Sequence, residues 1–151
     1  MGMLVRRDRA MVAVLIMLDV GFHAGRSSTV SAAEIAERAG LARRGIEPLL
    51  QALSRSGLLE SVRGPRGGYR LGRARRDICL CDVVRIATAE DSCTEDGPRG
   101  ELQDAVVDKL WHELDASMCE RLQLVTLDDL LRRAEAAGLR RPLAEPISFS
   151  I

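Results

Sequence analysis

The feature that most constrains the fold is a change of hydrophobic period at Gly57. Before it, residues 46–53 place isoleucine and leucine at the i, i+3, i+4, i+7 spacing that predicts the buried stripe of a helix. After it, residues 58–62 and 69–71 predict two short strands. The run RGPRGGY at residues 63–69 predicts the turn between them, and its three glycines permit the positive φ angles expected there. A basic β-hairpin directly after a helix predicts a wing.

A second, shorter helix with defined ends precedes that helix. Ser31 and Glu34 have the spacing of a capping box, in which the two side chains satisfy free backbone amides at a helix N-terminus. Gly40 is a residue type that ends helices, and two short helices joined by a tight turn form a helix-turn-helix. Residues 1–76 are therefore predicted to be a winged helix-turn-helix DNA-binding domain.

The remaining segments flank this unit. Residues 6–22 predict a first helix that is apolar on nearly every side, as expected for a helix buried against several neighbours. Residues 77–100 predict a short helix and a polar sensor loop. Thr126 opens a last helix that ends at Gly138, and residues 139–151 are expected to be a flexible tail.

A long helix is predicted between these parts. Residues 101–124 contain neither glycine nor proline, which gives a helix of about 36 Å. Its apolar residues step by four along one face, and the simplest partner for such a face is the same helix of a second subunit. We therefore expect residues 101–138 to form the dimerisation helices. The predicted interface residues are Leu102, Val106, Leu110, Trp111, Leu114, Met118 and Leu122.

The formal net charge of zero hides a strong asymmetry. Residues 1–76 contain 14 arginines and 6 acidic residues, a net charge of +8, and residues 77–151 carry a net charge of −8. A basic half joined to an acidic half is expected when only one half meets a polyanion. The longest apolar run, residues 10–18, is too short to span a bilayer, and no signal peptide is evident, so we expect a cytoplasmic protein.

These segments together resemble the IscR/NsrR/CymR family of winged-helix transcription regulators. The most specific match is GLLESVRGPRGGYRL, residues 57–71, and ICLCDVVRIA, residues 78–87, is similar to the family's I-T-L-x-D-V-V segment. The resemblance covers nearly the whole chain, with a gap around residues 90–105. It implies a mainly α fold with a small β-wing. The architecture it implies is a winged helix-turn-helix followed by a long dimerisation helix. Further matching segments are MLVRRDRAMVAVLIML (3–18), SAAEIAERAG (31–40) and VTLDDLL (125–131).

The resemblance also implies which residues contact DNA. Arg43, Arg44 and Glu47 lie at the exposed start of the second helix, where arginine can bind guanine and glutamate can accept from cytosine. Arg63 and Arg66 on the wing suit the minor groove or phosphates. Glycines beside them allow close approach, and a tyrosine anchors the wing. The predicted DNA-binding residues are Ser31, Arg43, Arg44, Glu47, Gln51, Arg63, Arg66, Gly67, Gly68 and Tyr69.

Two positions depart from the family's pattern. The family usually has a hydroxyl residue near position 44, where this chain has arginine, and it tends to have glutamine where this chain has Pro48. A proline inside a helix removes a hydrogen bond and can kink the helix, unless the helix begins near Gly45. The geometry of the recognition helix is therefore left open by the sequence.

Many members of the family sense through an iron–sulfur cluster held by three cysteines in the loop before the long helix. Here that loop contains only Cys93. Asp8 matches an acidic ligand on the first helix of some members, and His112 on the long helix is a further candidate ligand. Three interpretations of Cys93 stay open: an inert loop thiol, a redox-reactive thiol, or a ligand of a cluster with mixed ligands.

The other three cysteines have simpler interpretations. Cys79 and Cys81 form a C-x-C pair that could bind a soft metal. Cys79 takes the place of the family's capping threonine, which favours buried structural thiols. Cys119 on the long helix is expected to pack in an interface.

The sequence thus predicts a homodimeric, sequence-specific regulator that binds double-stranded DNA at a pseudo-palindromic site. Its signal would be an iron–sulfur cluster, a redox change or a metabolite. The alternative is a winged-helix protein-interaction module or complex subunit with weak DNA binding. The sequence argues against an enzyme, because it shows no Ser/His/Asp set, phosphate-cradling loop or metal-plus-carboxylate cluster.

Overall fold

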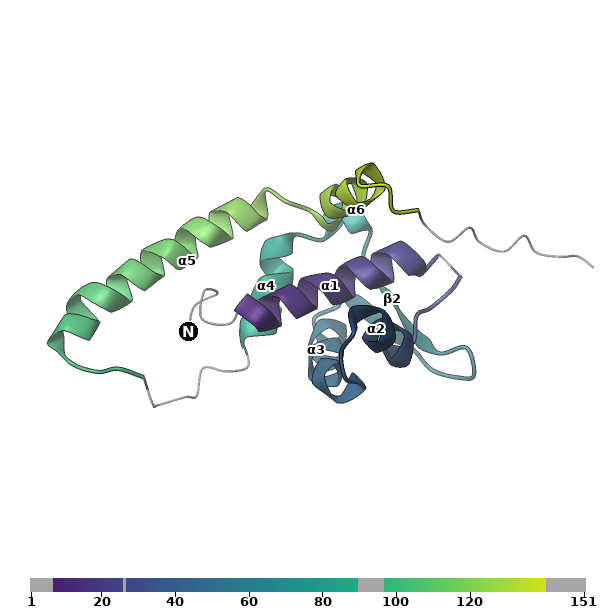
Figure 1. Ribbon diagram of the computed structural model, residues 1–151, viewed down its shortest axis with the longest axis horizontal. Coiled ribbons are helices and arrows are strands. Elements are labelled where there is room, and N and C mark those ends of the chain that lie inside the picture. The colour runs from purple at the N-terminus through teal and green to yellow at the C-terminus, as the bar shows by residue number, and fades with distance from the viewer. Residues whose placement is uncertain (1–6, 26, 90–96, 141–151) are drawn as a thin grey trace, which may run out of the picture.

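The computed structural model describes residues 7–25, 27–89 and 97–140 (Figure 1). These residues form a mainly helical fold with one two-stranded antiparallel sheet, as predicted. The elements in chain order are α1 (Arg7–His23), α2 (Ala32–Ala39), α3 (Arg43–Arg55), β1 (Leu59–Val62), β2 (Gly68–Leu71), the 3-10 turn η2 (Arg75–Asp77), α4 (Leu80–Ala89), the π-helical segment η3 (Gln103–Val107), α5 (Asp108–Gln123) and α6 (Leu127–Ala136).

Capping boxes define the start of two helices. At α2, the backbone N–H of Glu34 donates to Ser31 Oγ at 3.2 Å, and the N–H of Ser31 donates to Glu34 Oε2 at 2.7 Å. Thr126 and Asp129 exchange the same two bonds at α6. Gly40 ends α2 with a φ of 66°, a left-handed conformation that glycine adopts without strain. The predicted starts of both helices and the predicted end of α2 are confirmed, and α6 ends at Ala136, two residues before the predicted Gly138.

The hairpin is short and joined to a third segment of the chain. Its register pairs Leu59 with Leu71 and Val62 with Gly68. On the far side of β2, the backbones of Val30 and Tyr69 exchange two hydrogen bonds, at 2.9 and 2.7 Å. The wing is therefore held both by its own strand pairing and by the segment that leads into α2.

The glycines of the hairpin turn serve two different purposes. Gly64 has a φ of 113°, whereas Gly67 and Gly68 are not among the glycines with positive φ. The prediction of positive φ angles is therefore confirmed for Gly64 and was wrong for Gly67 and Gly68. A Cβ on Gly67 would lie 2.5 Å from the carbonyl oxygen of Val62, and one on Gly68 would lie 2.6 Å from that of Val30. Both residues are glycine because the backbone of the protein itself approaches them closely.

Helix α1 runs through the middle of the fold (Figure 1). It contacts α2, α3, α4, α6 and β2, and it buries Ile16, Met17 and Val20 completely or nearly so. The prediction of a helix buried against several neighbours is confirmed, but Met11 and Leu15 are 55% and 43% exposed. One apolar face of α1 is therefore uncovered. The rest of the main core consists of Ala13, Val30, Ala32, Ile35, Ala36, Ile46, Leu49, Leu50, Leu53, Leu58, Leu59, Ile78, Val83, Ala87, Leu127 and Leu131.

The chain returns to this body after the long helix. The N–H of Leu127 donates to the Ile78 carbonyl at 2.9 Å, and the N–H of Leu80 donates to the Val125 carbonyl at 3.0 Å. An ion pair between Arg75 Nε and Asp128 Oδ1, at 2.7 Å, joins η2 to α6. These bonds fix both ends of the segment that contains α4 and α5.

The long helix extends away from the body as an arm (Figure 1). Helical structure begins at Glu101, as predicted, but the first turns are π-helical over Gln103–Val107 before regular α-helix begins at Asp108. The prediction of one uninterrupted α-helix was therefore wrong in this segment. Among the helices that the structure describes, none is both long and apolar enough to cross a membrane.

Candidate nucleic-acid interface

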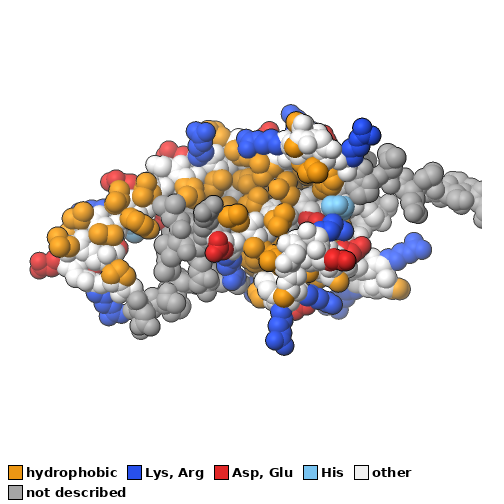
Figure 2. Space-filling model, in the orientation of Figure 1, with side chains coloured by type: hydrophobic (Ala, Val, Ile, Leu, Met, Phe, Trp, Pro, Cys, Tyr) orange, Lys and Arg blue, Asp and Glu red, His pale blue; other side chains and the backbone are white. Residues whose placement is uncertain are grey.

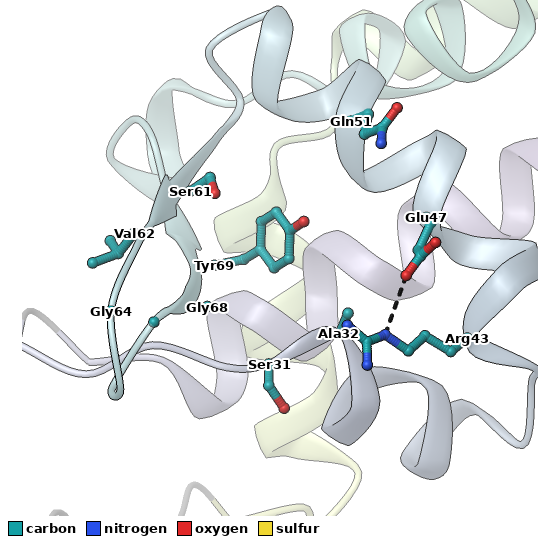
Figure 3. A pocket seen from close by; sticks show the side chains of 11 residues that line it. Ser31, Ala32, Arg43, Glu47, Gln51, Ser61, Val62, Gly64, Gly68 and Tyr69 are labelled. Carbon is teal, nitrogen blue, oxygen red and sulfur yellow. Dashed lines mark ion pairs between the residues drawn. The ribbon is translucent and has the colours of Figure 1, made fainter.

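A groove of about 410 Å³ separates α3 from the hairpin (Figure 3). One wall is the exposed side of α3, another is the hairpin, and the start of α2 closes one end. Seven of the ten predicted DNA-binding residues line it. The complete lining is Ser31, Ala32, Arg43, Glu47, Gln51, Ser61, Val62, Gly64, Gly67, Gly68 and Tyr69.

The amphipathic pattern of α3 determines what it presents to this groove. Ile46, Leu50 and Leu53 are fully buried and fix the helix against the core. Glu47 and Gln51 each follow directly after a buried residue and are four positions apart, so they share a different face of the helix and are exposed on the wall of the groove. The same spacing that predicted the helix thus also positions its polar face.

Arg43 and Glu47 form an ion pair one turn apart, with 3.2 Å between Nε and Oε1 (Figure 3). Both side chains are largely exposed. A helical pair of this kind contributes about 0.3–0.5 kcal/mol, whereas a good base contact contributes about 1–3 kcal/mol. Either side chain can therefore leave the other for a nucleotide at little cost.

Pro48 lies inside α3, which is helical from Arg43 to Arg55. The helix does not begin near Gly45, so the proline falls in its second turn. Proline has no N–H to donate to the carbonyl of Arg44, one turn earlier. The side chain of Pro48 is exposed, and the helix continues through it.

The remaining predicted arginines lie outside the groove. Arg63 and Arg66 are exposed at the turn of the hairpin, and Arg44 is exposed on α3. The hydroxyl of Thr29 donates to the carbonyl of Arg66 at 2.8 Å, which ties the turn to the segment before α2. The arginines of the wing therefore project from a backbone that is held at both Thr29 and Val30.

A cross-strand ion pair neutralises another arginine of the hairpin. Arg70 donates two hydrogen bonds to the carboxylate of Glu60, at 2.8 and 3.0 Å. These bonds and the opposite charge lower the pKa of Glu60 and raise the pKa of Arg70. The pair joins β1 to β2 at the base of the wing, as cross-strand pairs do.

Two residues of the groove also support the local fold. Tyr69 is half-buried, packs against the main core and points from the hairpin toward α3 (Figure 3). Its place is consistent with the anchoring role that the family resemblance implies. Ser31 lines the groove, but its hydroxyl also accepts the bond that caps α2. The backbone N–H and hydroxyl of Ser31 lower the pKa of Glu34 by hydrogen bonding to its carboxylate.

Four residues that line the groove were not among the predicted DNA-binding residues: Ala32, Ser61, Val62 and Gly64. Ser61 lines the groove from β1, directly opposite Tyr69 in the hairpin register. Once Tyr69 was placed, strand pairing alone would have indicated Ser61. The bond from Thr29 to Arg66 joins residues 37 positions apart, and no local pattern predicts it.

The predicted cluster ligands are only partly described. Cys93 lies outside the described residues. Asp8 is exposed in the first turn of α1, and His112 is exposed on α5, where its Nδ1 lies 2.7 Å from the carbonyl oxygen of Asp108. Within residues 7–25, 27–89 and 97–140, no three His, Cys, Asp or Glu side chains are grouped to hold a metal ion. An iron–sulfur site at Cys93 stays a prediction.

By exposure, the apolar stripe of the long helix falls into two parts. Hydrophobic side chains gather on the surface at the outer end of the arm (Figure 2). The first five residues of the stripe are exposed, from 41% for Trp111 and Leu114 to 79% for Leu102. Met118 and Leu122 are half-buried instead and pack against Cys81 and Val84 of α4. The last two residues of the predicted dimer interface thus also contribute to packing within their own chain. The five exposed residues are Leu102, Val106, Leu110, Trp111 and Leu114, called the α5 stripe below.

Comparisons with known proteins agree with this geometry. The model of the Rrf2 family, described as iron-dependent transcriptional regulators, matches residues 7–133. The HTH-type transcriptional regulator IscR of Photobacterium profundum is 36% identical over 123 residues, which are 80% of this chain and 71% of the relative. IscR of Vibrio atlanticus is 35% identical over 126 residues, which are 82% of this chain and 72% of the relative.

Solved structures show the same fold. IscR of T. potens superposes with a TM-score of 0.68 at 35% identity, covering 89% of this chain and 90% of that one. CymR, the global cysteine regulator of B. subtilis, superposes with a TM-score of 0.63 at 27% identity, covering 83% and 94%. These relatives are transcription regulators and not enzymes. With the family model matched from α1 to α6, the chain is a winged-helix, DNA-binding transcription regulator of the Rrf2 family.

Proposed function

We propose that this regulator binds DNA as a homodimer, with α3 in the major groove and the hairpin turn at the adjacent minor groove or phosphates. The observation that supports this most directly is the groove between α3 and the hairpin. Its walls bring base-reading side chains, Arg43, Glu47 and Gln51, next to a glycine-rich turn with two exposed arginines. The groove and the hairpin turn beside it thus combine groups suited to base edges with groups suited to phosphates.

Charge supports the same orientation. The net charge of +8 lies in residues 1–76, which contain the helix-turn-helix and the hairpin. Contacts between arginine and phosphate release counterions, so the affinity of such a surface falls steeply with salt. The acidic second half contains α5 and α6, which we place away from the duplex.

The α5 stripe supports the homodimer. Five large apolar side chains lie exposed on one helix that extends from the body, and Met11 and Leu15 of α1 are exposed as well. Apolar surface of this extent usually marks an interface. A two-fold dimer would present two copies of α3, which matches an inverted repeat with half-sites about one helical turn apart.

A salt series tests DNA binding. Fluorescence anisotropy with genomic duplex fragments should give an affinity that falls steeply as salt rises. Arg66→Ala should lower the slope of log K against log salt by about 1, because one phosphate contact is lost. Arg133→Ala is the matched control, since Arg133 is exposed on α6 and does not line the groove. An unchanged slope for Arg66→Ala would contradict the proposed contact, and weak, sequence-blind binding would favour a protein partner.

We propose that the signal is received at Cys93, in the segment before the long helix, and that the protein acts in the cytoplasm. The family description is iron-dependent, but this segment has one cysteine and not three. Iron, acid-labile sulfide and visible absorption of anaerobically purified protein test a cluster, with Cys93→Ala beside it. Loss of all three signals in the variant would assign a cluster to Cys93. An iron-free protein that still binds DNA would exclude the cluster and leave a thiol or metabolite signal.

A further inference from the structure

Cys79 and Cys81 meet a third cysteine that is distant in the sequence, Cys119, between α4 and α5. Cys81 is buried on α4, and Cys119 is half-buried on α5. Cys119 packs against the small cluster that Cys81 forms with Val84, and this neighbouring thiol helps to raise the pKa of Cys81. Cys79 belongs to the same small apolar cluster, and its Sγ lies 3.5 Å from the carbonyl oxygen of Leu122. Cys119 was expected to pack in an interface; in this structure it contacts its own chain.

The two facing thiols have different surroundings. The guanidinium of Arg85 reaches from α4 and donates to Cys119 Sγ at 3.0 Å, and Gln123 Nε2 lies 3.9 Å from the same sulfur. A neighbouring guanidinium stabilises a thiolate, and the exposed position of Arg85 shows that solvent reaches this edge of the cluster. Burial, followed by the contact with Cys119, raises the pKa of Cys81 to about 12. Cys119, which is only half-buried and which Arg85 contacts, is therefore suited to react first with a hydroperoxide, and the buried Cys81 to attack the oxidised sulfur afterwards.

We propose that Cys81 and Cys119 are a reversible redox pair, which a hydroperoxide oxidises to an intramolecular disulfide between α4 and α5. The pair is distinct from Cys93 and from the loop before the long helix. The oxidation of this pair is proposed independently of the proposed mode of DNA binding. The two cysteines lie at the packed end of α5, beyond the α5 stripe. A dimer formed through that stripe can therefore leave them accessible.

The chemistry balances in two steps. The Cys119 thiolate attacks one oxygen of hydrogen peroxide, the O–O bond breaks, and a sulfenic acid forms as hydroxide leaves and takes a proton to become water. The Cys81 sulfur then attacks the Cys119 sulfur, the S–O bond breaks, and the second water leaves with the Cys81 proton. Two thiols have lost two electrons to one peroxide. A dithiol reductant reverses the reaction by thiol–disulfide exchange.

The bond would add a covalent link at a junction whose apolar contact is small. Among the described residues, the apolar contact between α4 and α5 is the small cluster around Cys81, Val84, Met118, Cys119 and Leu122. Helix α4 in turn packs against α1 and α3. A disulfide here would tie the arm to the part of the body that positions the recognition helix, so oxidation would restrict the movement of the arm relative to α3.

Thiol counting and peptide mapping test the pair. Full-length protein with Cys93→Ser is treated with hydrogen peroxide, alkylated in denaturant without reductant, digested and analysed by mass spectrometry. We expect two thiols to be lost per chain, a single peptide pair linked through Cys81 and Cys119, and complete reversal by dithiothreitol. Cys79→Ser is the matched control and should leave this result unchanged.

Two variants test the assigned roles. With Cys81→Ser, oxidation should stop at a sulfenic acid on Cys119 that dimedone traps. Arg85→Gln should slow disulfide formation about tenfold or more, because the thiolate loses its charged donor. The mapping on the Cys93→Ser protein stands even if a variant fails to fold. A disulfide that involves Cys79, a link between chains, or retention of both thiols under peroxide that oxidises the methionines would overturn the proposal.

Discussion

Val30 and Tyr69 exchange two backbone hydrogen bonds, at 2.9 and 2.7 Å, and so attach the hairpin to the segment that leads into α2. The wing of this regulator is therefore not a free two-stranded ribbon, which would be marginally stable alone. Its position relative to the helix-turn-helix is determined by the backbone. Because Arg66 is also bonded through its carbonyl to Thr29, the wing and the recognition helix form one surface of fixed shape.

This attachment predicts that Gly68→Ala destabilises the protein. The new Cβ would lie 2.6 Å from the Val30 carbonyl oxygen, so β2 would have to move away from Val30. We expect a loss of about 1–3 kcal/mol in the free energy of unfolding, measured by urea denaturation. Gly97→Ala is the control, because a Cβ there meets nothing within 4 Å. Equal stability of the two variants would show that the wing is not held as described.

The ion pair on α3 leads to a prediction about base discrimination. Glu47→Ala should relax the preference at one base pair of each half-site by about 1–3 kcal/mol, with little change in salt dependence. Arg43 stays available for DNA in this variant, because the pair that is lost is exposed and weak. Glu37→Ala, on the exposed side of α2, is the control. Competition assays with single-base substitutions measure the effect, and an unchanged preference would remove Glu47 from the reading surface.

The α5 stripe predicts how the dimer can be broken. Leu110→Glu places a charge in the middle of the stripe, where Leu110 is 46% exposed in the single chain. Burying an unpaired carboxylate is costly, so sedimentation velocity should show a monomer with unchanged helix content. Leu139→Glu, an exposed apolar position after α6, should leave the dimer intact. A Leu110→Glu protein that remains dimeric would place the interface elsewhere.

The capping box of α2 predicts a specific dependence of stability on pH. Hydrogen bonds from Ser31 lower the pKa of Glu34 in the folded protein. Such a carboxylate stabilises the fold fully above its unfolded pKa of about 4.3, and this contribution is lost as the pH falls through the folded value. The difference in unfolding free energy between wild type and Glu34→Gln should therefore shrink on acidification. A constant difference would mean that the charge of Glu34 plays no part.

Much of this structure could be predicted from short-range patterns. The capping pairs Ser31–Glu34 and Thr126–Asp129, the stripe of α3 and the hairpin are encoded within a few residues each, and the structure confirms them. The polar wall of the groove followed from the same spacing. The exposed face of α1 was not predicted, because periodicity reports how apolar a helix is and not which neighbours cover it.

Contacts distant in sequence were beyond such patterns. Cys81 and Cys119 lie on different helices and meet only because the chain returns through α5 to the body. The glycines at 67 and 68 were assigned to backbone angles, although the approach of other carbonyl oxygens explains them. No pattern of residue types in the sequence predicts the π-helical turns at Gln103–Val107.

The most direct test of the central claim is to select binding sites for the full-length protein from random DNA duplexes and to footprint the enriched sequence. A two-fold dimer that reads DNA with α3 and the hairpin predicts an inverted repeat. Its half-sites should be centred about one helical turn apart, and its enrichment should be lost in Arg43→Ala with Arg66→Ala. No enriched sequence, or an asymmetric site bound equally well by the double variant, would contradict the account.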